Sequence, residues 1–328
     1  MNFSKTRASY ILGIALLLLA VLVGIFTLRF WERRNSGFDG NSKYEMAGVT
    51  VYDGVKYVQR ADVETILIIG IDKFDNSGLG DDSYINDSCA DFLTLLVIDK
   101  TNDKVSTVYI NRNTITDITA IGIGGKEIGT FKGQVALSHT YGSGLQDSCR
   151  YTVKAVSSAL NGIKIDRYVS LTMDAVGKIN DMVGGVTLTV MDDLSSIDPL
   201  LVKGETVTLD ADSALNYVRS RQGLDDPSNE ARMERQKQYI EALTEALRSK
   251  IDNDDEFSAE LISDLSKYMV TNCTSGQLER ISNNVYEFAS GGSYTPEGEL
   301  RVTEYAEFYP DYDSVMEILI EVVYKTVK

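Results

Sequence analysis

The chain has 328 residues, of which 43% are hydrophobic and 24% charged, with 26 Gly and only 4 Pro. These proportions exclude a collagen-like or wholly disordered protein, and the length is ample for a folded core. The formal net charge is −16, and because residues 1–34 hold more basic than acidic side chains, the rest of the chain is more acidic still. A body this acidic repels nucleic acid, so we expect no nucleic-acid partner.

The first feature along the chain is an uncharged apolar stretch from Ala8 to Leu28. A helix needs about 20 such residues to cross a bilayer core. A collar of arginine and tryptophan follows the stretch, as is typical of a membrane interface, and no small-residue cleavage signal lies just beyond it. We therefore predict a cytoplasmic tail over residues 1–7 and a transmembrane anchor over residues 8–30. The protein is then expected in the cell membrane, with its body outside the cytoplasm.

Residues 31–60 are polar and lack strong periodicity, which predicts a stalk before a folded domain over residues 61–328. That domain begins with apolar runs rich in β-branched residues, which predict buried strands. The predicted strands are Thr65–Ile71, Phe92–Ile98 and Val105–Ile110. A turn-forming cluster at residues 99–104 indicates that the last two form a hairpin.

Helices and strands alternate through the next part of the chain, which favours an α/β fold. The predicted elements, in chain order, are a helix over Gln146–Leu160, a strand over Tyr168–Met173, a helix over Ala175–Val183, a strand over Val186–Val190, a short helix from Asp210 to Tyr217, a long helix that begins at Ser228 or Asn229 and runs to about Lys250, further helices, and a C-terminal helix over Tyr312–Val327.

Three charged residues stand at the ends of the first three strands. Asp72 follows the first strand, Asp91 opens the second and Arg112 closes the third. In the predicted hairpin, Asp91 lies opposite Arg112, with Cβ atoms roughly 5 Å apart. If the first strand runs parallel to the third, Asp72 reaches the same edge. Two carboxylates are what Mg²⁺ takes from a protein when phosphate and water supply the rest, so this edge is a candidate metal–phosphate site. Loop carboxylates that only stabilise turns are the alternative.

A second group of polar residues follows the short helix and continues on the long one. Arg219 and Arg221 are two residues apart and would point to one side of an extended chain. Arg232, Arg235 and Gln236 have the spacing of one helical stripe, which borders the apolar face of the helix. Guanidinium groups bind phosphate oxygens in bidentate fashion, so this cluster is a candidate pyrophosphate site. A structural network of salt bridges is the alternative.

The chain has three cysteines, Cys89, Cys149 and Cys273, and one histidine, His139. With no CxxC motif and no second histidine, the sequence offers no zinc ligand set, and we interpret His139 as structural. An extracellular domain permits disulfides. We therefore consider a bond between Cys89 and Cys149, with unpaired thiols as the alternative.

These residues together resemble the LytR–CpsA–Psr family of membrane-anchored bacterial cell-wall proteins, over roughly residues 61–250. The matching stretches, in order, are IGID at 69–72, ADFLTLLVID at 90–99, YINRNT at 109–114, GGV at 184–186, LNYVRSR at 215–221 and ARMERQ at 231–236. The resemblance implies a three-layer α/β/α sandwich with a mixed central sheet and a tunnel for a prenyl chain. It also implies a phosphotransferase that moves a glycopolymer from a polyprenyl-pyrophosphate carrier to peptidoglycan.

The resemblance also assigns roles to residues. Asp72 and Asp91 match aspartates associated with Mg²⁺, and Arg112, Asn113 and Asp91 become the candidates for catalysis. The residues that match the surroundings of the pyrophosphate are Arg112, Arg219, Arg221, Arg232, Arg235 and Gln236.

The chain departs from the family pattern at two positions. Cys89 stands where the family commonly has arginine, and Asn113 stands where it has aspartate. Since an asparagine side chain cannot usefully accept a proton, one alternative is a catalytically weak protein that binds polyprenyl-linked glycans as a scaffold or regulator. A second alternative is a lipid-pyrophosphate hydrolase. A transcription regulator is disfavoured, because the acidic body is predicted to lie outside the cell.

Overall fold

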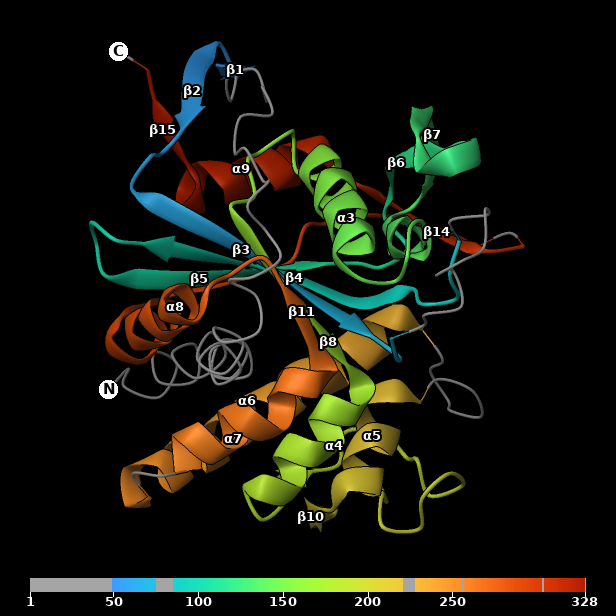
Figure 1. Ribbon diagram of the computed structural model, residues 1–328, viewed down its shortest axis with the longest axis vertical. Helices are drawn as coiled ribbons and strands as arrows, with labels where there is room; N and C mark the ends of the chain where they lie inside the picture. The colour runs from blue at the N-terminus through green and yellow to red at the C-terminus, as the bar shows by residue number, and fades with distance from the viewer. Residues whose placement is uncertain (1–48, 75–84, 221–227, 255–256, 303, 328) are drawn as a thin grey trace.

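A six-stranded mixed sheet forms the centre of the protein (Figure 1). The computed structural model describes residues 49–74, 85–220, 228–254, 257–302 and 304–327. The strands, in spatial order, are β11 (Met269–Thr271), β8 (Arg167–Thr172), β3 (Val63–Ile71), β4 (Ala90–Asp99), β5 (Lys104–Ile110) and β12 (Ala289–Tyr294). Strand β4 is antiparallel to both β3 and β5, so β3 and β5 end at the same edge of the sheet.

The predicted hairpin is confirmed, with Asp99 facing Lys104 and Leu93 facing Ile110. The pairing of β3 with β4 contains an irregularity near that edge. Gly70 faces Phe92 and the next residue of β3 faces Ala90, so Asp91 is an extra residue in β4. A Cβ atom on Gly70 would lie 2.8 Å from the Cβ atom of Phe92, so only glycine allows β4 to approach this closely.

Helices cover both faces of the sheet (Figure 1). Five helices contribute to the buried apolar cluster on one face: α4 (Met173–Met182), α5 (Ala211–Arg219), α6 (Asn229–Asn253), α7 (Phe257–Leu265) and α8 (Ser275–Glu287). Two helices contribute to the cluster on the other face: α3 (Gln146–Ala159) and α9 (Tyr312–Val322). The predicted α/β fold with a mixed central sheet is therefore confirmed.

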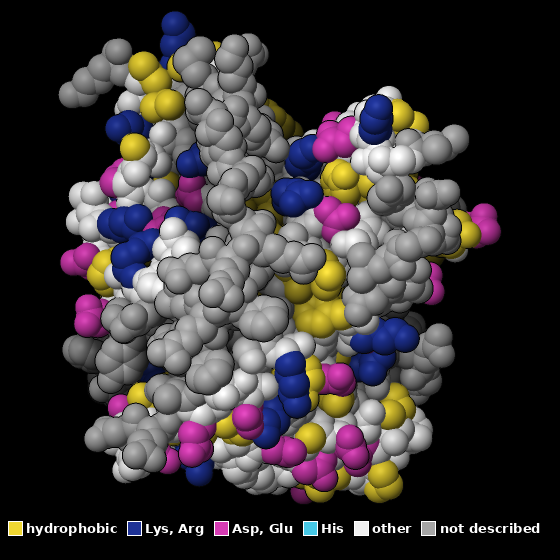
Figure 2. All heavy atoms as spheres, viewed as in Figure 1, with side chains coloured by type: hydrophobic (Ala, Val, Ile, Leu, Met, Phe, Trp, Pro, Cys, Tyr) yellow, Lys and Arg dark blue, Asp and Glu magenta, His cyan; other side chains and the backbone are white. Residues whose placement is uncertain are grey.

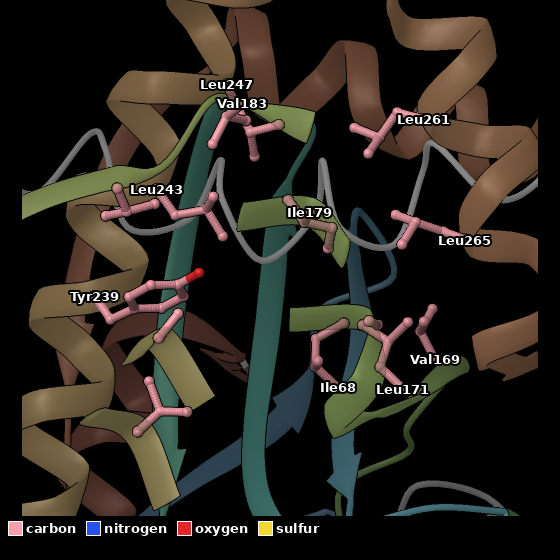
Figure 3. Packing of buried hydrophobic residues seen from close by; sticks show 14 of the residues in the cluster. Ile68, Val169, Leu171, Ile179, Val183, Tyr239, Leu243, Leu247, Leu261 and Leu265 are labelled. Atoms are coloured by element: carbon pink, nitrogen blue, oxygen red, sulfur yellow. The ribbon is translucent and has the colours of Figure 1, made fainter. Parts of the chain in front are cut away.

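Strand β3 illustrates how the sequence builds two cores at once. Ile66 and Ile68 belong to the cluster beneath α4 and α6, whereas Leu67 and Ile69 belong to the cluster beneath α3 and α9. Successive strand residues point to opposite faces, so a continuous apolar run is what a sheet buried on both faces requires. Figure 3 shows Ile68 meeting Leu171 of β8, with residues of α4, α6 and α7 packed above them.

Both predicted helix caps are present. The carboxylate of Asp210 accepts a hydrogen bond from the backbone N–H of Ser213 at the start of α5. The hydroxyl of Ser228 accepts one from the backbone N–H of Ala231 at the start of α6. These bonds satisfy donors that the first turn of a helix leaves unpaired, and they fix where the two helices of the arginine cluster begin.

The two ends of the described chain differ from the prediction. Part of the predicted stalk is folded, because β1 (Thr50–Tyr52) and β2 (Val55–Gln59) form a small antiparallel sheet with β15 (Tyr324–Thr326). The C-terminal helix correspondingly ends at Val322, before β15. Strand β2 has no fully buried residue, so its sequence lacks the apolar pattern that would have revealed it.

The remaining described elements are short. They are the strand pairs β6 (Ile115–Ile121) with β7 (Glu127–Gln134), β9 (Val186–Thr189) with β10 (Thr206–Leu209) and β13 (Gly298–Val302) with β14 (Ala306–Pro310), and the 3₁₀ helices η1 (Ile123–Gly125), η2 (Val135–Thr140) and η3 (Ser266–Tyr268). The predicted tail and anchor, residues 1–7 and 8–30, lie outside the described residues. Within the described ranges, no helix is both long and apolar enough to cross a membrane.

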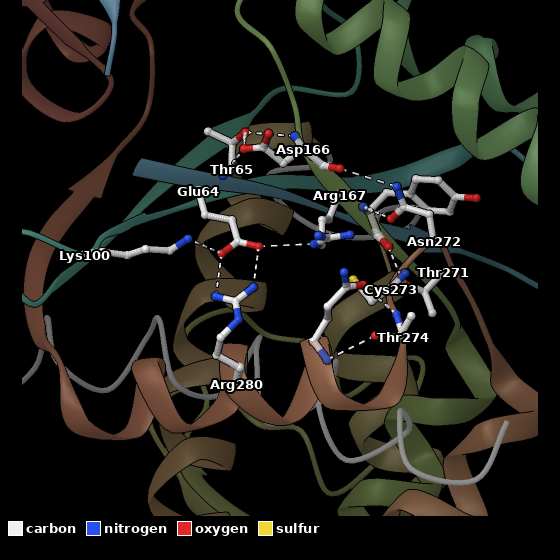
Figure 4. Close-up of polar contacts among 12 residues, drawn as sticks. Glu64, Thr65, Lys100, Asp166, Arg167, Thr271, Asn272, Cys273, Thr274 and Arg280 are labelled. Atoms are coloured by element: carbon white, nitrogen blue, oxygen red, sulfur yellow. Dashed lines mark hydrogen bonds and ion pairs between the residues drawn. The ribbon is translucent and has the colours of Figure 1, made fainter. Parts of the chain in front are cut away.

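Three cations surround one buried carboxylate at the opposite end of β3 from Asp72 (Figure 4). The carboxylate of Glu64 contacts Lys100 at 2.8 Å, Arg280 at 2.7 Å and Arg167 at 3.2 Å. Burial alone would raise the pKa of Glu64, but the hydrogen bonds from Arg280 and Lys100 outweigh it and lower the pKa to about 2. Ionised Glu64 therefore stabilises the fold at neutral pH.

We expect Glu64→Gln to lower the free energy of unfolding by about 3 kcal/mol near neutral pH, since the pKa is depressed from 4.5 to about 2. Because the pKa of Glu64 is lower in the folded protein than in the unfolded chain, its ionised carboxylate stabilises the fold at pH values above 4.5. This stabilisation is lost as the pH falls from 4.5 towards 2. Urea denaturation of parent and variant across this range measures it. A difference between the two proteins that does not shrink on acidification would contradict the assignment.

Candidate functional site

The extra residue of β4, Asp91, lies between two arginines from different elements. Arg112, just after β5, places its Nη1 atom 2.9 Å from Oδ1 of Asp91. Arg232, in the first turns of α6, places its Nη1 atom 3.9 Å from the same oxygen and donates from Nη2 to the Asp91 backbone carbonyl at 3.2 Å. The predicted meeting of Asp91 with Arg112 is thus confirmed, and Arg232 joins them. A bulge redirects a side chain at a sheet edge, which is its role here.

Asp72 forms the second ion pair at this edge of the sheet. Its two carboxylate oxygens lie 2.9 and 3.0 Å from Nη2 of Arg219, which is the last residue of α5. Both side chains are about half exposed, at 50% and 51%. An exposed pair of this kind contributes little to stability, so the geometry leaves these groups available to a ligand.

Cys89 lies among the same charges. Burial raises the pKa of its thiol, the positive charge of Arg112 opposes that shift, and the negative charges of Asp91 and Asp72 reinforce it. The charges of Asp72, Asp91 and Arg112 therefore all act on this thiol.

Of the two alternatives for Cys89 and Cys149, the structure has the unpaired thiols, because all three cysteines are unbridged. The imidazole of His139 explains this: its Nδ1 atom lies 2.8 Å from the carbonyl of Ser88, and its Nε2 atom lies 3.8 Å from the sulfur of Cys149. The ring therefore stands between Cys149 and the chain that precedes Cys89. His139 is fully buried, and burial lowers its pKa, so the structural interpretation of this residue is confirmed.

Arg235 and Gln236 face the inside of the protein. Arg235 is fully buried; it donates from Nε to the carbonyl of Tyr217 at 3.0 Å and from Nη1 to Asp192 at 2.7 Å, and it also donates from Nη2 to the carbonyl of Ser220. Gln236 donates to the carbonyl of Val218 at 3.0 Å. These bonds hold the C-terminal end of α5 against α6. Both residues thus position the segment that carries Arg219.

A cavity of about 80 Å³ lies between the sheet and the helices α4 and α6. Its lining is almost wholly apolar and includes Phe92, Leu171, Val176, Ile240 and Leu243. Two buried polar atoms of the lining, Oγ1 of Thr172 and Oε1 of Gln236, have no hydrogen-bond partner in the described part of the chain. Buried polar atoms normally have a partner, so these two are suited to a bound molecule or water.

The charged site and the cavity adjoin one another. The lining residues Gly70, Phe92, Val218 and Gln236 are one or two positions along the chain from Asp72, Asp91, Arg219 and Arg235, respectively. On β3, residues two apart share a face, so the carboxylate that follows the strand points to the cavity side. The arrangement suits a ligand with an anionic head and an apolar tail.

Metal binding depends on only two carboxylates. Within the described ranges, no group of three or more His, Cys, Asp or Glu side chains could hold a metal ion. Asp72 and Asp91 are both partly exposed at the cavity mouth, at 50% and 29%. Two carboxylates and a phosphate are the donor set that Mg²⁺ accepts, so these residues fit the ion when an anionic ligand completes its shell.

The other predicted site residues have different outcomes. Arg221 lies outside the described residues. Asn113 is buried, and its backbone is fixed on both sides: its N–H donates to Oδ1 of Asn111 at 3.0 Å, and its carbonyl accepts from Phe308 at 2.9 Å. The sequence analysis missed Asp192, the partner of Arg235, because it lies in a loop without any periodic signal.

Surface charge sets the context of the site. Figure 2 shows acidic and basic side chains interspersed over the visible face, so the negative charge of the protein is not gathered into one region there. At the end of the sheet, in contrast, Arg112 and Arg232 meet at Asp91, and Arg219 pairs with Asp72. Three arginines against two carboxylates leave guanidinium groups there that an anion can contact.

Comparisons with known proteins agree with this arrangement. The model of the LytR_cpsA_psr family matches residues 35–295. The chain is 27% identical over 186 residues to the polyisoprenyl-teichoic acid–peptidoglycan teichoic acid transferase TagU of Halalkalibacterium halodurans, covering 57% of this chain and 54% of that protein. It is 26% identical over 230 residues to TagU of Bacillus cereus, covering 69% and 66%. The chain thus spans about half to two thirds of the length of these relatives.

Solved structures show the same fold. TagV of B. subtilis superposes with a TM-score of 0.56 at 22% identity, covering 79% of this chain and 95% of that one. TagT, in a structure described as bound to LIIa-WTA, superposes with a TM-score of 0.58 at 19% identity, covering 80% and 91%. The mixed sheet with its flanking helices is therefore an arrangement that these proteins share.

The different surroundings of Arg235 and Arg219 lead to a test of their roles. We expect Arg235→Met to lower the free energy of unfolding by about 3 kcal/mol, since it removes a buried charge and leaves two carbonyls and Asp192 without their donor. Arg219→Met, in an exposed pair, should change it by less than about 1 kcal/mol. Guanidinium chloride denaturation measures both. Equal losses in the two variants would show that Arg235 does not brace α5.

Proposed function

The chain belongs to the LytR–CpsA–Psr family, and we propose that it transfers a glycopolymer from a polyprenyl-pyrophosphate carrier to peptidoglycan. The proposal rests above all on one observation: an apolar cavity opens beside a cluster of arginines. A polyprenyl pyrophosphate has the matching chemistry, with a hydrocarbon tail and an anionic head. The relatives named above as teichoic acid transferases support the reaction class.

The arginines of the site divide into two roles in this proposal. Arg112, Arg219 and Arg232 lie at the cavity mouth, where their guanidinium groups are held by Asp91 and Asp72 and can exchange those carboxylates for phosphate oxygens. Arg235 spends its donors on α5 and Asp192, and so positions Arg219.

The transfer step needs little covalent chemistry from the protein. A sugar hydroxyl of the acceptor attacks the phosphorus that bears the glycopolymer and forms the new P–O bond. The proton of that hydroxyl passes to solvent, and the polyprenyl phosphate leaves with the electrons of the broken P–O bond. Such a reaction depends on positioning and on positive charge over the phosphates, which the three arginines supply. The side chains of the described site offer no activated nucleophile, and the proposed step requires none.

We further propose that Mg²⁺ is held by Asp72 and Asp91 together with the pyrophosphate. When bound, the ion would neutralise phosphate charge at the end of the cavity. Asp91 would then serve both the metal and Arg112, which accounts for its place between an open edge and two guanidinium groups.

The location of the protein completes the proposal. A lipid carrier and a peptidoglycan acceptor meet at the outer surface of a membrane. An anchor over residues 8–30, with the body outside the cytoplasm, would place the cavity within reach of both. The support for this location is the uncharged apolar stretch and its flanking arginines in the sequence.

A second candidate function is glycan binding with little turnover, as a scaffold or regulator. The observation that favours it is Asn113, a buried neutral amide beside Arg112. An amide can orient a neighbour by hydrogen bonds, but it cannot take the proton of the attacking hydroxyl.

The amphiphilic site predicts that head and tail binding can be impaired separately. We expect Arg219→Ala to weaken binding of both polyprenyl pyrophosphate and inorganic pyrophosphate by about tenfold, because a charge-assisted contact is lost. Val176→Trp, which fills the cavity from α4, should weaken only the lipid, by about tenfold or more. Calorimetric titration of each ligand, with the lipid in detergent, measures both effects.

A tryptophan at the exposed Val202, far along the chain from the cavity lining, is the matched control for Val176→Trp. Lipid affinity should match that of the parent in this variant. If Val176→Trp also leaves lipid binding unchanged, the tail does not occupy this cavity, and the proposed substrate class is wrong.

Turnover is tested separately at Asn113. If a missing carboxylate limits the rate, Asn113→Asp should raise glycopolymer transfer to peptidoglycan by about tenfold or more, within the range that general base catalysis supplies. The assay follows labelled glycopolymer into the insoluble wall fraction and free phosphate in solution. If the parent protein is fully active and Asn113→Asp transfers glycopolymer no faster, the scaffold function is excluded. Release of phosphate in the absence of an acceptor would indicate a hydrolase instead.

A further inference from the structure

A chain of hydrogen bonds, buried except at the exposed side chain of Glu230, connects the loop after β5 to the start of α6. Asn111 is buried, and its side chain makes three of these bonds. Its Nδ2 atom donates to Oε1 of Glu230 at 2.7 Å, and its Oδ1 atom accepts from Nδ2 of Asn229 at 2.9 Å and from the backbone N–H of Asn113 at 3.0 Å. The loop that carries Arg112 is therefore tied to the first turn of α6.

The same chain of bonds continues to the charged site. The Oδ1 atom of Asn229, also buried, accepts a hydrogen bond from Nη2 of Arg232 at 2.6 Å. That nitrogen also donates to the backbone carbonyl of Asp91 at 3.2 Å. Two neutral amides thus join Arg232 to the chain on either side of Arg112, and both arginines reach the same carboxylate.

Only one orientation of the Asn111 amide satisfies all of these contacts. Rotation of the amide by half a turn would set its NH₂ group against two other donors, on Asn113 and Asn229, and its oxygen against the carboxylate of Glu230. The carboxylate accepts only, so it determines the direction of every bond in the chain. A network whose bonds all run in one fixed direction restricts the geometry of the groups at its ends.

We propose that Asn111 and Asn229 are positioning residues, oriented by Glu230, that hold Arg112 and Arg232 at the spacing required to bind the two phosphates of the substrate. The inference rests on the proposed function, because it assigns the two arginines to the pyrophosphate. Neither amide is required to touch the substrate. Their contribution is to fix two guanidinium groups, which belong to different elements, before the ligand arrives.

The network suggests a test by reversal of polarity. Asn111→Asp keeps both acceptor contacts, from Asn113 and Asn229, but sets its second oxygen against Glu230, so the bond between the loop and the Glu230 carboxylate is lost and repulsion replaces it. Glu230→Gln keeps an acceptor for Asn111 and should bind as the parent does. In the double variant N111D/E230Q, the new glutamine NH₂ donates to the new carboxylate, and the connection is restored with its direction reversed.

Calorimetry measures the affinity of each variant for inorganic pyrophosphate. We expect N111D to bind about tenfold or more weakly than the parent, and E230Q to bind with parental affinity. The double variant should recover to within about threefold of the parental affinity. Transfer assays should follow the same order. Recovery of thermal stability without recovery of binding would overturn the proposal, as would parental affinity in N111D. Loss of turnover in E230Q, with binding intact, would overturn it in favour of Glu230 as a catalytic base.

A control and a ligand-free readout separate this proposal from the function it rests on. Thr65→Val removes a buried hydroxyl bond at the opposite end of β3, and it should lower the melting temperature without changing pyrophosphate affinity. The Nε–H NMR signals of Arg112 and Arg232 report their positions without any ligand. If the parent protein fails to bind pyrophosphate, the proposed function is wrong. The NMR signals still test the positioning role in that case. If the amides position the arginines, the signals are displaced in N111D and return to their parental positions in N111D/E230Q.

Discussion

The extra residue in β4 is the constraint on which the site depends. Because Gly70 faces Phe92 while the next residue of β3 faces Ala90, Asp91 leaves the ladder at the point where the sheet ends. The tight turn that pairs Asp99 with Lys104 sets the register of the hairpin, and this register brings Arg112 to the same place from β5. Strand pairing alone would alternate side chains between the two faces. The bulge instead presents a carboxylate at the open edge, where residues from both the sheet and a helix can reach it.

Two helices then converge on this edge, and their ends suit its chemistry. Helix α5 ends at Arg219, whose positive charge is favourable near the negative end of the helix dipole, and the first turns of α6 carry Arg232, which donates to the Asp91 carbonyl. Holding two helix ends together requires that their free backbone groups be satisfied. Buried Arg235 does this by donating to the carbonyl of Tyr217 in α5 and to the carbonyl of the C-cap residue Ser220. This arginine of the cluster therefore serves the scaffold, whereas Arg219 stays about half exposed.

The sequence was informative where local periodicity determined the outcome. Continuous apolar runs rich in β-branched residues and a six-residue turn were enough to predict the meeting of Asp91 with Arg112, and N-cap residues located α5 and α6. The prediction that Arg235 faces the ligand had the same helical spacing behind it, but spacing cannot distinguish a lined pocket from the end of a neighbouring helix. Asn111 carried no signal at all, since its two partners on α6, Asn229 and Glu230, lie more than a hundred positions away. The pairing of β12 with β5 and of β15 with β2 was missed for the same reason.

The arrangement also explains how an acidic protein could select an anionic lipid over free anions. With a net charge of −16, the protein repels small anions at long range, although salt limits that repulsion to about 10 Å. Contacts from Arg112, Arg219 and Arg232 act only at the cavity mouth, and each must first exchange a carboxylate for a phosphate oxygen, so their net gain is small. The apolar cavity adds a term that free phosphate cannot use, about 0.8 kcal/mol for each buried methylene. In the proposed function, selectivity for a lipid-linked pyrophosphate would therefore follow from the joint requirement for head and tail, and neither half of the site would need to bind tightly alone.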